Sequence, residues 1–170
     1  APDRGVDLRR PLLVVDDDQG LLLSIKTILL SSDMPEPALV SDSREVLSLL
    51  REHPFNLVLL DNMMPHVTGM ELLKEIKEAF PEIECIMVTA VDDVGTAVEA
   101  IKYGAYDYLV KPLNSEKLKI VISRAMERYN LRKDLALYKN KQLFSDLKNP
   151  DAFSNLVAED ESMALVFHQV

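Results

Sequence analysis

The chain alternates short apolar runs with segments in which apolar residues recur every three or four positions. The apolar runs predict strands near 11–15, 38–41, 57–61, 84–89 and 107–110. The amphipathic segments predict helices near 19–31, 43–52, 69–79, 94–103 and from 115 onward. Five strand–helix units in succession indicate an α/β fold, with a parallel sheet covered by helices on both faces.

An extended helix is predicted at the end of this pattern. No proline occurs between Pro112 and Pro150 and no glycine follows Gly104, so nothing interrupts a helix over 115–148, which would be roughly 50 Å long. Its first turns carry an apolar stripe suited to packing on the sheet, made of Leu118, Ile122, Ala125 and Tyr129. A second stripe in a different phase is made of Leu131, Leu135 and Tyr138. Because no core is left for the second stripe to cover, we expect it to pack against another helix, as in a homodimer.

Four of the predicted strands end at, or are followed by, residues with acidic, hydroxyl or amino side chains. Asp16 and Asp17 follow the first strand, Asp61 ends the third, Thr89 ends the fourth, and Lys111 follows the fifth. The carboxyl ends of parallel strands open into one crevice, where the acids would repel one another unless a cation lay among them. Each feature alone is more often structural, but their joint occurrence in this order predicts a functional site.

The expected cation is Mg²⁺, because it prefers hard oxygen ligands and commonly binds one or two carboxylates together with phosphate. Asp17 and Asp61 are the expected direct ligands, together with the backbone carbonyl of Met63. Asp16 is expected to contact the ion through a water molecule. A neighbouring acid, Asp18, is interpreted instead as the cap of the helix that follows it.

Asp61 is also suitably placed to act as a nucleophile toward phosphorus, because carboxylates form acyl phosphates. Mg²⁺, Lys111 and the Thr89 hydroxyl would neutralise and hydrogen-bond the phosphoryl oxygens. An aspartate-nucleophile phosphatase of the haloacid-dehalogenase type would need a second Asp two residues after the nucleophile to act as acid and base, and Met63 stands there.

The net charge of −9 is unevenly distributed, with −10 over residues 1–114, +5 over 115–148 and −4 over 149–170. An acidic body argues against direct nucleic-acid binding, because phosphate contacts need Lys and Arg. The charges of the basic stretch are interleaved with apolar residues at helical spacing, which favours a solvated helix face. With no long apolar run and no leader-like start, we expect a cytoplasmic protein without a membrane segment.

Residues from about 10 to 128 resemble the receiver domain of bacterial two-component response regulators. The matching residues are Asp16-Asp17, Asp61-Asn62-Met63-Met64-Pro65 with Gly69, Thr89-Ala90 and Lys111-Pro112. The resemblance implies a flavodoxin-like, doubly wound (βα)5 sheet with strand order 2-1-3-4-5, Asp61 as phosphoacceptor and a sensor histidine kinase as phosphodonor. It also implies structural roles for Pro65, Gly69 and Pro112, and a cis Lys111–Pro112 bond.

The same resemblance implies a switch rather than an enzyme. Thr89 would move toward the phosphoryl group while the aromatic Tyr108 turns inward, and Ala90 would belong to the same phosphoryl-binding and switch residues. The positions two beyond Asp61 and two beyond Thr89 flank the path of the hydrolytic water in this family, and here they are Met63 and Val91. Since neither side chain can orient water, we expect slow autodephosphorylation.

A narrower resemblance is to the NtrC-like transcription activators, carried by 104–113, the basic helix, and 153–157 with Ser162-Met163. It implies a helical linker over 129–149 and, over 150–170, the start of an AAA+ ATPase domain that acts on the sigma-54 form of RNA polymerase. Residues 1–9 are expected to be a disordered or tag-like leader. No GxxxxGK loop is present, so we expect ATP hydrolysis to reside outside these residues. A receiver whose output is protein docking without transcription control stays an alternative.

Overall fold

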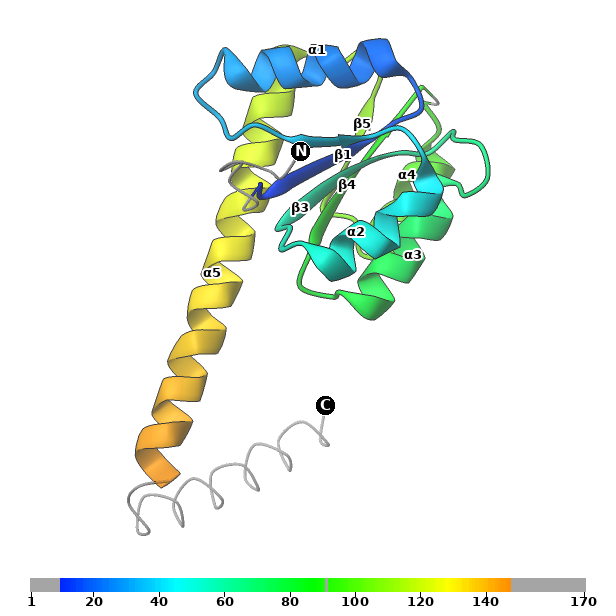
Figure 1. Ribbon diagram of the computed structural model, residues 1–170. Coiled ribbons are helices and arrows are strands. Elements are labelled where there is room, and N and C mark those ends of the chain that lie inside the picture. Colours follow the sequence, from blue (N-terminus) through cyan, green and yellow to red (C-terminus); the bar gives the residue numbers. More distant parts are fainter. Residues whose placement is uncertain (1–9, 91, 148–170) are drawn as a thin grey trace. The chain divides into compact units, whose positions relative to one another are not determined.

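The computed structural model describes residues 10–90 and 92–147 of the chain. Within them, a five-stranded parallel sheet has the order β2-β1-β3-β4-β5 (Figure 1). The strands are β1 (Leu12–Val15), β2 (Ala38–Val40), β3 (Leu57–Asp61), β4 (Glu84–Thr89) and β5 (Asp107–Val110). The predicted α/β fold and its strand order are therefore confirmed.

Helices cover both faces of this sheet. They are α1 (Gln19–Leu30), α2 (Val46–Glu52), α3 (Gly69–Ala79), α4 (Val94–Lys102) and α5 (Ser115–Leu147), and a 3-10 turn η1 (Ser43–Glu45) precedes α2. The helix α1 and the first turns of α5 pack on one face, while α2, α3 and α4 pack on the other (Figure 1). This is the two-sided covering that five successive strand–helix units require.

The core forms two apolar layers because alternate residues of each strand face opposite sides of the sheet. Leu13 and Val15 of β1 contact the layer under α2 and α3, while Leu12 and Val14 contact the layer under α1 and α5. Every residue of β1, β3 and β4 is buried, as expected for central parallel strands covered on both sides. The sheet is thus a rigid platform, and its carboxyl edge carries the polar residues.

The helix starts follow local capping chemistry. Asp18 caps α1 as predicted, since its side chain accepts a hydrogen bond from the Leu21 N–H at 3.2 Å. The helix predicted over 43–52 begins instead with η1, where the Asp42 side chain accepts the Arg44 N–H at 3.0 Å. This hydrogen bond joins residues only two positions apart, which favours a tighter 3-10 turn. The α-helix itself begins at Val46.

The chain divides into two compact units, Ala1–Tyr129 and Asn130–Val170. In the first unit, α5 buries Leu118, Val121, Ile122 and Ala125. In the second, the described part of α5 exposes Leu131, Leu135 and Tyr138. The segments 1–9 and 150–170, predicted as a leader and as the start of an effector domain, lie outside the described residues. Within 10–90 and 92–147, no helix is long and apolar enough to cross a membrane.

Candidate functional site

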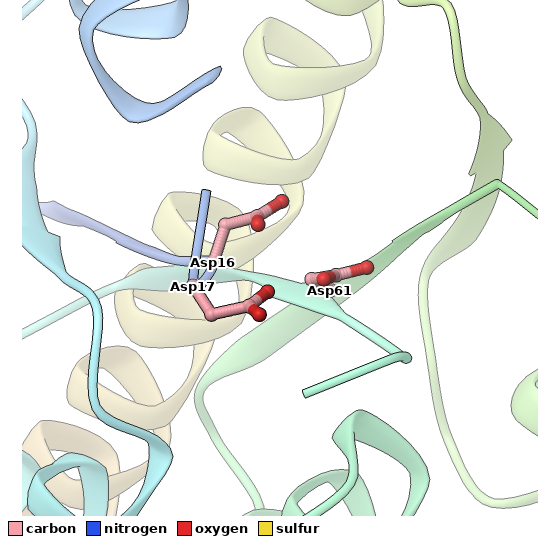
Figure 2. Close-up of side chains that lie close together, drawn as sticks. All are labelled: Asp16, Asp17 and Asp61. Atoms are coloured by element: carbon pink, nitrogen blue, oxygen red, sulfur yellow. The ribbon is translucent and has the colours of Figure 1, made fainter. Parts of the chain in front are cut away.

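Three carboxylates meet at the carboxyl edge of the sheet. Asp16 follows the last residue of β1, Asp17 comes next, and Asp61 ends the neighbouring strand β3. One oxygen from each lies within 4.8 Å of the others (Figure 2). Asp16 and Asp61 are buried, whereas Asp17 is exposed. The predicted acidic cluster is therefore present in the folded chain, with its open side toward Asp17.

Lys111 places the positive charge among these acids. Its Nζ lies 2.9 Å from Asp16 Oδ2 and 3.4 Å from Asp61 Oδ1. Burial alone would lower the pKa of Lys111, but the hydrogen bond and charge of Asp16, with a contribution from Asp61, raise it above its usual value. The lysine therefore stays protonated at neutral pH and holds the two buried carboxylates together.

One lysine does not offset the repulsion completely. Burial, followed by the charge of Asp16, raises the pKa of Asp61 to about 6, although Lys111 and the Met63 N–H oppose the shift. Asp16 makes a further contact, since its Oδ1 accepts the Asp18 N–H at 2.9 Å. A further cation would stabilise such a site, because its oxygen donors repel one another and one carboxyl resists ionisation.

The strands β4 and β5 bring the hydroxyl residues to the same edge. Thr89, the last residue of β4, is fully buried, and its carbonyl accepts the Lys111 N–H at 2.8 Å. Ala90 follows it and is exposed. Tyr108 on β5 is half-buried; burial raises its pKa, and a hydrogen bond with the Thr89 side chain opposes that shift. Thr89 and Tyr108, both predicted as switch residues, are thus neighbours.

The loop between β3 and α3 lies beside Asp61. The Met63 N–H donates to Asp61 Oδ1 at 3.4 Å, and its side chain is 64% exposed, so it borders the open side of the site. The loop ends where Gly69 packs on Asp61: a Cβ on Gly69 would collide with the Asp61 carbonyl oxygen, which explains the glycine. Pro65 lies within the loop, and the Lys111–Pro112 bond is cis.

Two sulfur-containing side chains lie in the core and not at the site. Met64 is buried in the core layer beneath this loop, and Cys85 is fully buried, with burial raising the pKa of its thiol to about 12. Two polar residues at the site were not assigned a role from the sequence. Asn62 Oδ1 accepts the Met70 N–H at 3.1 Å, and Ser43 contacts the β3–α3 loop.

Residues 12–123 match the family model described as the response regulator receiver domain. The chain belongs to this family. Among curated relatives, it is 41% identical over 120 residues to the transcriptional regulatory protein ZraR of Klebsiella oxytoca, covering 71% of this chain and 27% of that protein. This receiver therefore spans little more than a quarter of the length of the relatives it matches.

Solved structures agree with the sequence match. The beryllofluoride-activated NtrC4 receiver domain dimer has a TM-score of 0.66 at 36% identity and covers 69% of this chain and 97% of its own. NtrX from Brucella abortus in complex with ATP has a TM-score of 0.67 at 32% identity and covers 74% of this chain and 28% of its own. The predicted resemblance to receiver domains of NtrC-like regulators is confirmed.

The raised pKa of Asp61 predicts a pH-dependent stability. Because its pKa of about 6 in the fold exceeds the value of about 3.9 in an unfolded chain, the folded state loses stability as the pH rises between these values. Asp61→Asn should therefore stabilise the metal-free receiver at pH 8 by up to about 3 kcal/mol, with the gain vanishing near pH 4. Urea unfolding in EDTA at several pH values measures this.

The control is Asp42→Asn, because hydrogen bonds from Arg44 lower the pKa of Asp42 to about 2. Its folded pKa is depressed, so removing that carboxylate should give no gain at pH 8. A gain for Asp61→Asn that is equally large at pH 4 and pH 8 would show that shape or packing, and not charge, is responsible.

Proposed function

We propose that this receiver is a phosphorylation-dependent switch, in which Asp61 accepts a phosphoryl group from a sensor histidine kinase in the presence of Mg²⁺. The observation that carries the proposal is the cluster of Asp16, Asp17 and Asp61, with Lys111 Nζ 3.4 Å from Asp61 Oδ1. A metal site alone would not require the lysine. A structural ion pair alone would not require the exposed Asp17.

The donor set fits Mg²⁺. Asp17 and Asp61 would bind the ion directly, Asp16 through a water molecule, and the Met63 carbonyl would complete the protein ligands. When bound, the ion would neutralise charge on the acids and on the phosphoryl oxygens. The raised pKa of Asp61, which burial and the charge of Asp16 cause despite Lys111, supports this assignment, because a bound cation would favour the ionised carboxylate.

The chain's own residues have separate tasks in the transfer. An Asp61 carboxylate oxygen forms the new bond to phosphorus as the bond between phosphorus and the donor's imidazole nitrogen breaks, and the leaving imidazole takes up a proton. Lys111, already charged and 3.4 Å from Asp61, would turn to one phosphoryl oxygen. The Thr89 hydroxyl and the Ala90 N–H would bind the others, leaving Tyr108 to turn inward.

The output of the switch would be control of transcription. Relatives are named as transcriptional regulators, and this receiver covers 27% of the length of ZraR. We infer that a downstream AAA+ domain acting on sigma-54 RNA polymerase receives the signal in the rest of the protein. The same proposal locates the chain in the cytoplasm and assigns no direct nucleic-acid contact to the receiver.

We also propose that the chain forms a homodimer through the second stripe. Leu131, Leu135 and Tyr138 are 62%, 53% and 65% exposed, which leaves three large apolar side chains of the second unit without cover. The NtrC4 receiver domain, with 36% identity, is itself described as a dimer.

Asp61 is predicted to be the sole phosphoacceptor, with modification dependent on Mg²⁺. Incubation with phosphoramidate should add one phosphoryl group to the chain, detected by intact-mass spectrometry. Both the addition of EDTA and the substitution Asp61→Asn should abolish this labelling. The matched control is Asp33→Asn, an exposed acid at φ 54°, where asparagine is equally well accommodated. Equal labelling of the Asp61→Asn variant would refute the assignment.

Autodephosphorylation is predicted to be slow, because Met63 cannot orient a water molecule in line with the phosphorus. Val91, which would flank the same path, lies outside the described residues. Met63→Asn should shorten the lifetime of the aspartyl phosphate several-fold, on the order of 1 kcal/mol in the barrier. Met63→Leu keeps an apolar side chain and should preserve the lifetime; if both variants match the parent, the explanation is wrong.

Dimerisation is predicted to require residues beyond Tyr129. Sedimentation at tens of micromolar should show a modest dimer for the full chain and a monomer for a version ending at Tyr129. Because residues 115–148 carry a net charge of +5, like-charge repulsion opposes a parallel pair, and added salt should tighten the dimer. Replacing Leu131 and Leu135 with Ser should give the same result as truncation. If the full chain, the truncated version and the substituted chain are all monomers, this segment serves only as a tether.

A further inference from the structure

The loop from Asn62 to Thr68 follows Asp61 in the chain and borders its carboxylate. It carries Met63, whose N–H contacts the Asp61 carboxylate. Both ends of the loop are fixed by Asn62, because its side chain accepts the Met70 N–H at 3.1 Å and its carbonyl accepts the Gly69 N–H at 3.1 Å. These bonds close the loop at its base. Within residues 63–67 the Val67 N–H donates to the Pro65 carbonyl at 2.9 Å across His66, and any further restraint on this turn must come from outside the loop.

The middle of the loop contains a backbone conformation that needs support. His66 has φ 71°, in the left-handed region, which costs of order 1 kcal/mol for a residue with a side chain. Such a conformation persists only where the surrounding structure holds it. The residues on either side, Pro65 and Val67, are therefore where a restraint would act.

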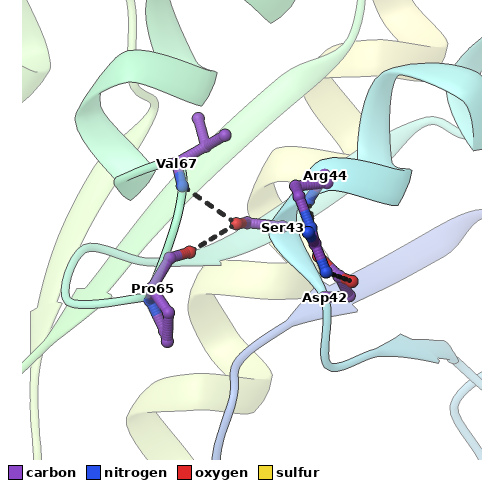
Figure 3. A network of polar contacts seen from close by, with 5 residues as sticks. All are labelled: Asp42, Ser43, Arg44, Pro65 and Val67. Carbon is purple, nitrogen blue, oxygen red and sulfur yellow. Dashed lines mark hydrogen bonds and ion pairs between the residues drawn. The ribbon is translucent and has the colours of Figure 1, made fainter.

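Ser43 supplies that restraint from a different part of the chain. Its Oγ donates to the Pro65 carbonyl at 2.9 Å and accepts the Val67 N–H at 3.3 Å, so one hydroxyl contacts the backbone on both sides of His66 (Figure 3). The partners are 22 and 24 residues away in sequence. The serine is 3% exposed, so water has little access to replace these bonds.

The turn that carries Ser43 leaves its hydroxyl available for the loop. A serine at a helix start commonly caps its own helix, but here Asp42 accepts the Arg44 N–H at 3.0 Å and pairs with the Arg44 guanidinium at 2.8 Å (Figure 3). The capping position is therefore occupied by Asp42. Ser43 is left to contact the segment that follows the phosphoacceptor.

We propose that Ser43 is a positioning residue of the phosphorylation site. Its hydroxyl fixes residues 65–67, and through them the Met63 backbone that borders Asp61 and is expected to contribute a carbonyl to the metal. The proposal rests on the function proposed above. Losing the hydroxyl would free the loop, lower the affinity for Mg²⁺ and slow phosphorylation, while leaving the acids and Lys111 in place.

The test compares Ser43→Ala with Ser41→Ala, which removes a hydroxyl from an exposed serine two residues away. In the metal-free full chain, hydrogen exchange should be about fivefold faster at Val67 in Ser43→Ala, as expected for the loss of one buried hydrogen bond. Calorimetric titration with Mg²⁺ should show a dissociation constant raised by a similar factor, and labelling by phosphoramidate should be slower at equal Mg²⁺. Ser41→Ala should match the parent in all three.

A second variant keeps the test decisive if alanine disturbs folding. Ser43→Cys keeps a side chain of the same shape, with a slightly larger thiol in place of the hydroxyl, and weakens the hydrogen bonds; it should change the same quantities in the same direction. A lower melting temperature with unchanged Val67 exchange and Mg²⁺ affinity would overturn the proposal, because the serine would then be only structural. If the parent chain neither binds Mg²⁺ nor labels at Asp61, the proposed function fails, and exchange at Val67 alone decides whether Ser43 holds the loop.

Discussion

Two buried carboxylates share one lysine at the edge of this sheet, and the rest of the site is arranged around that imbalance. Asp16 and Asp61 are brought together because β1 and β3 are adjacent parallel strands whose carboxyl ends coincide. Lys111 makes the pair tolerable, but burial and the charge of Asp16 still raise the pKa of Asp61. A folded protein that keeps such a site holds free energy that a bound cation can release.

The fold keeps this site rigid on one side and adjustable on the other. The central strands are buried throughout, so Asp16, Asp61 and Thr89 are fixed by close packing. Beyond β4, the helix α4 buries only Ala100 among its residues, and it exposes Val94 and Val98. An element held by so few apolar contacts can change position at little cost. A structural change that begins at Thr89 would therefore move α4 more easily than the sheet.

Most of this arrangement could be predicted from the sequence, because the spacing of apolar residues locates the strands and the strand ends locate the site residues. Apolar runs located the strands, and Asp16, Asp61 and Lys111 followed from being at strand ends, where topology alone brings them together. Ser43 could not be found in this way, because a serine at a predicted helix start is ordinarily a local cap and its partners lie 22 and 24 residues away. The ion pair of Glu84 could not be predicted for a similar reason. Its partner Arg128 lies 44 positions away in sequence, and in the fold Arg128 Nε lies 3.5 Å from Glu84 Oε1.

The Glu84 pair also limits how the receiver can communicate along α5. Glu84 is a buried carboxylate at the start of β4, at the end of the strand away from Thr89, and Arg128 additionally contacts the Tyr106 ring at 5.6 Å. The Arg128 side chain is 46% exposed, so this pair is a partly solvated contact between α5 and the buried Glu84. The helix is thus fixed to the sheet one residue before the first compact unit ends at Tyr129. A signal from Asp61 that reaches residues beyond Tyr129 along the chain must therefore displace α5 together with this pair, or leave the helix in place and act through another surface.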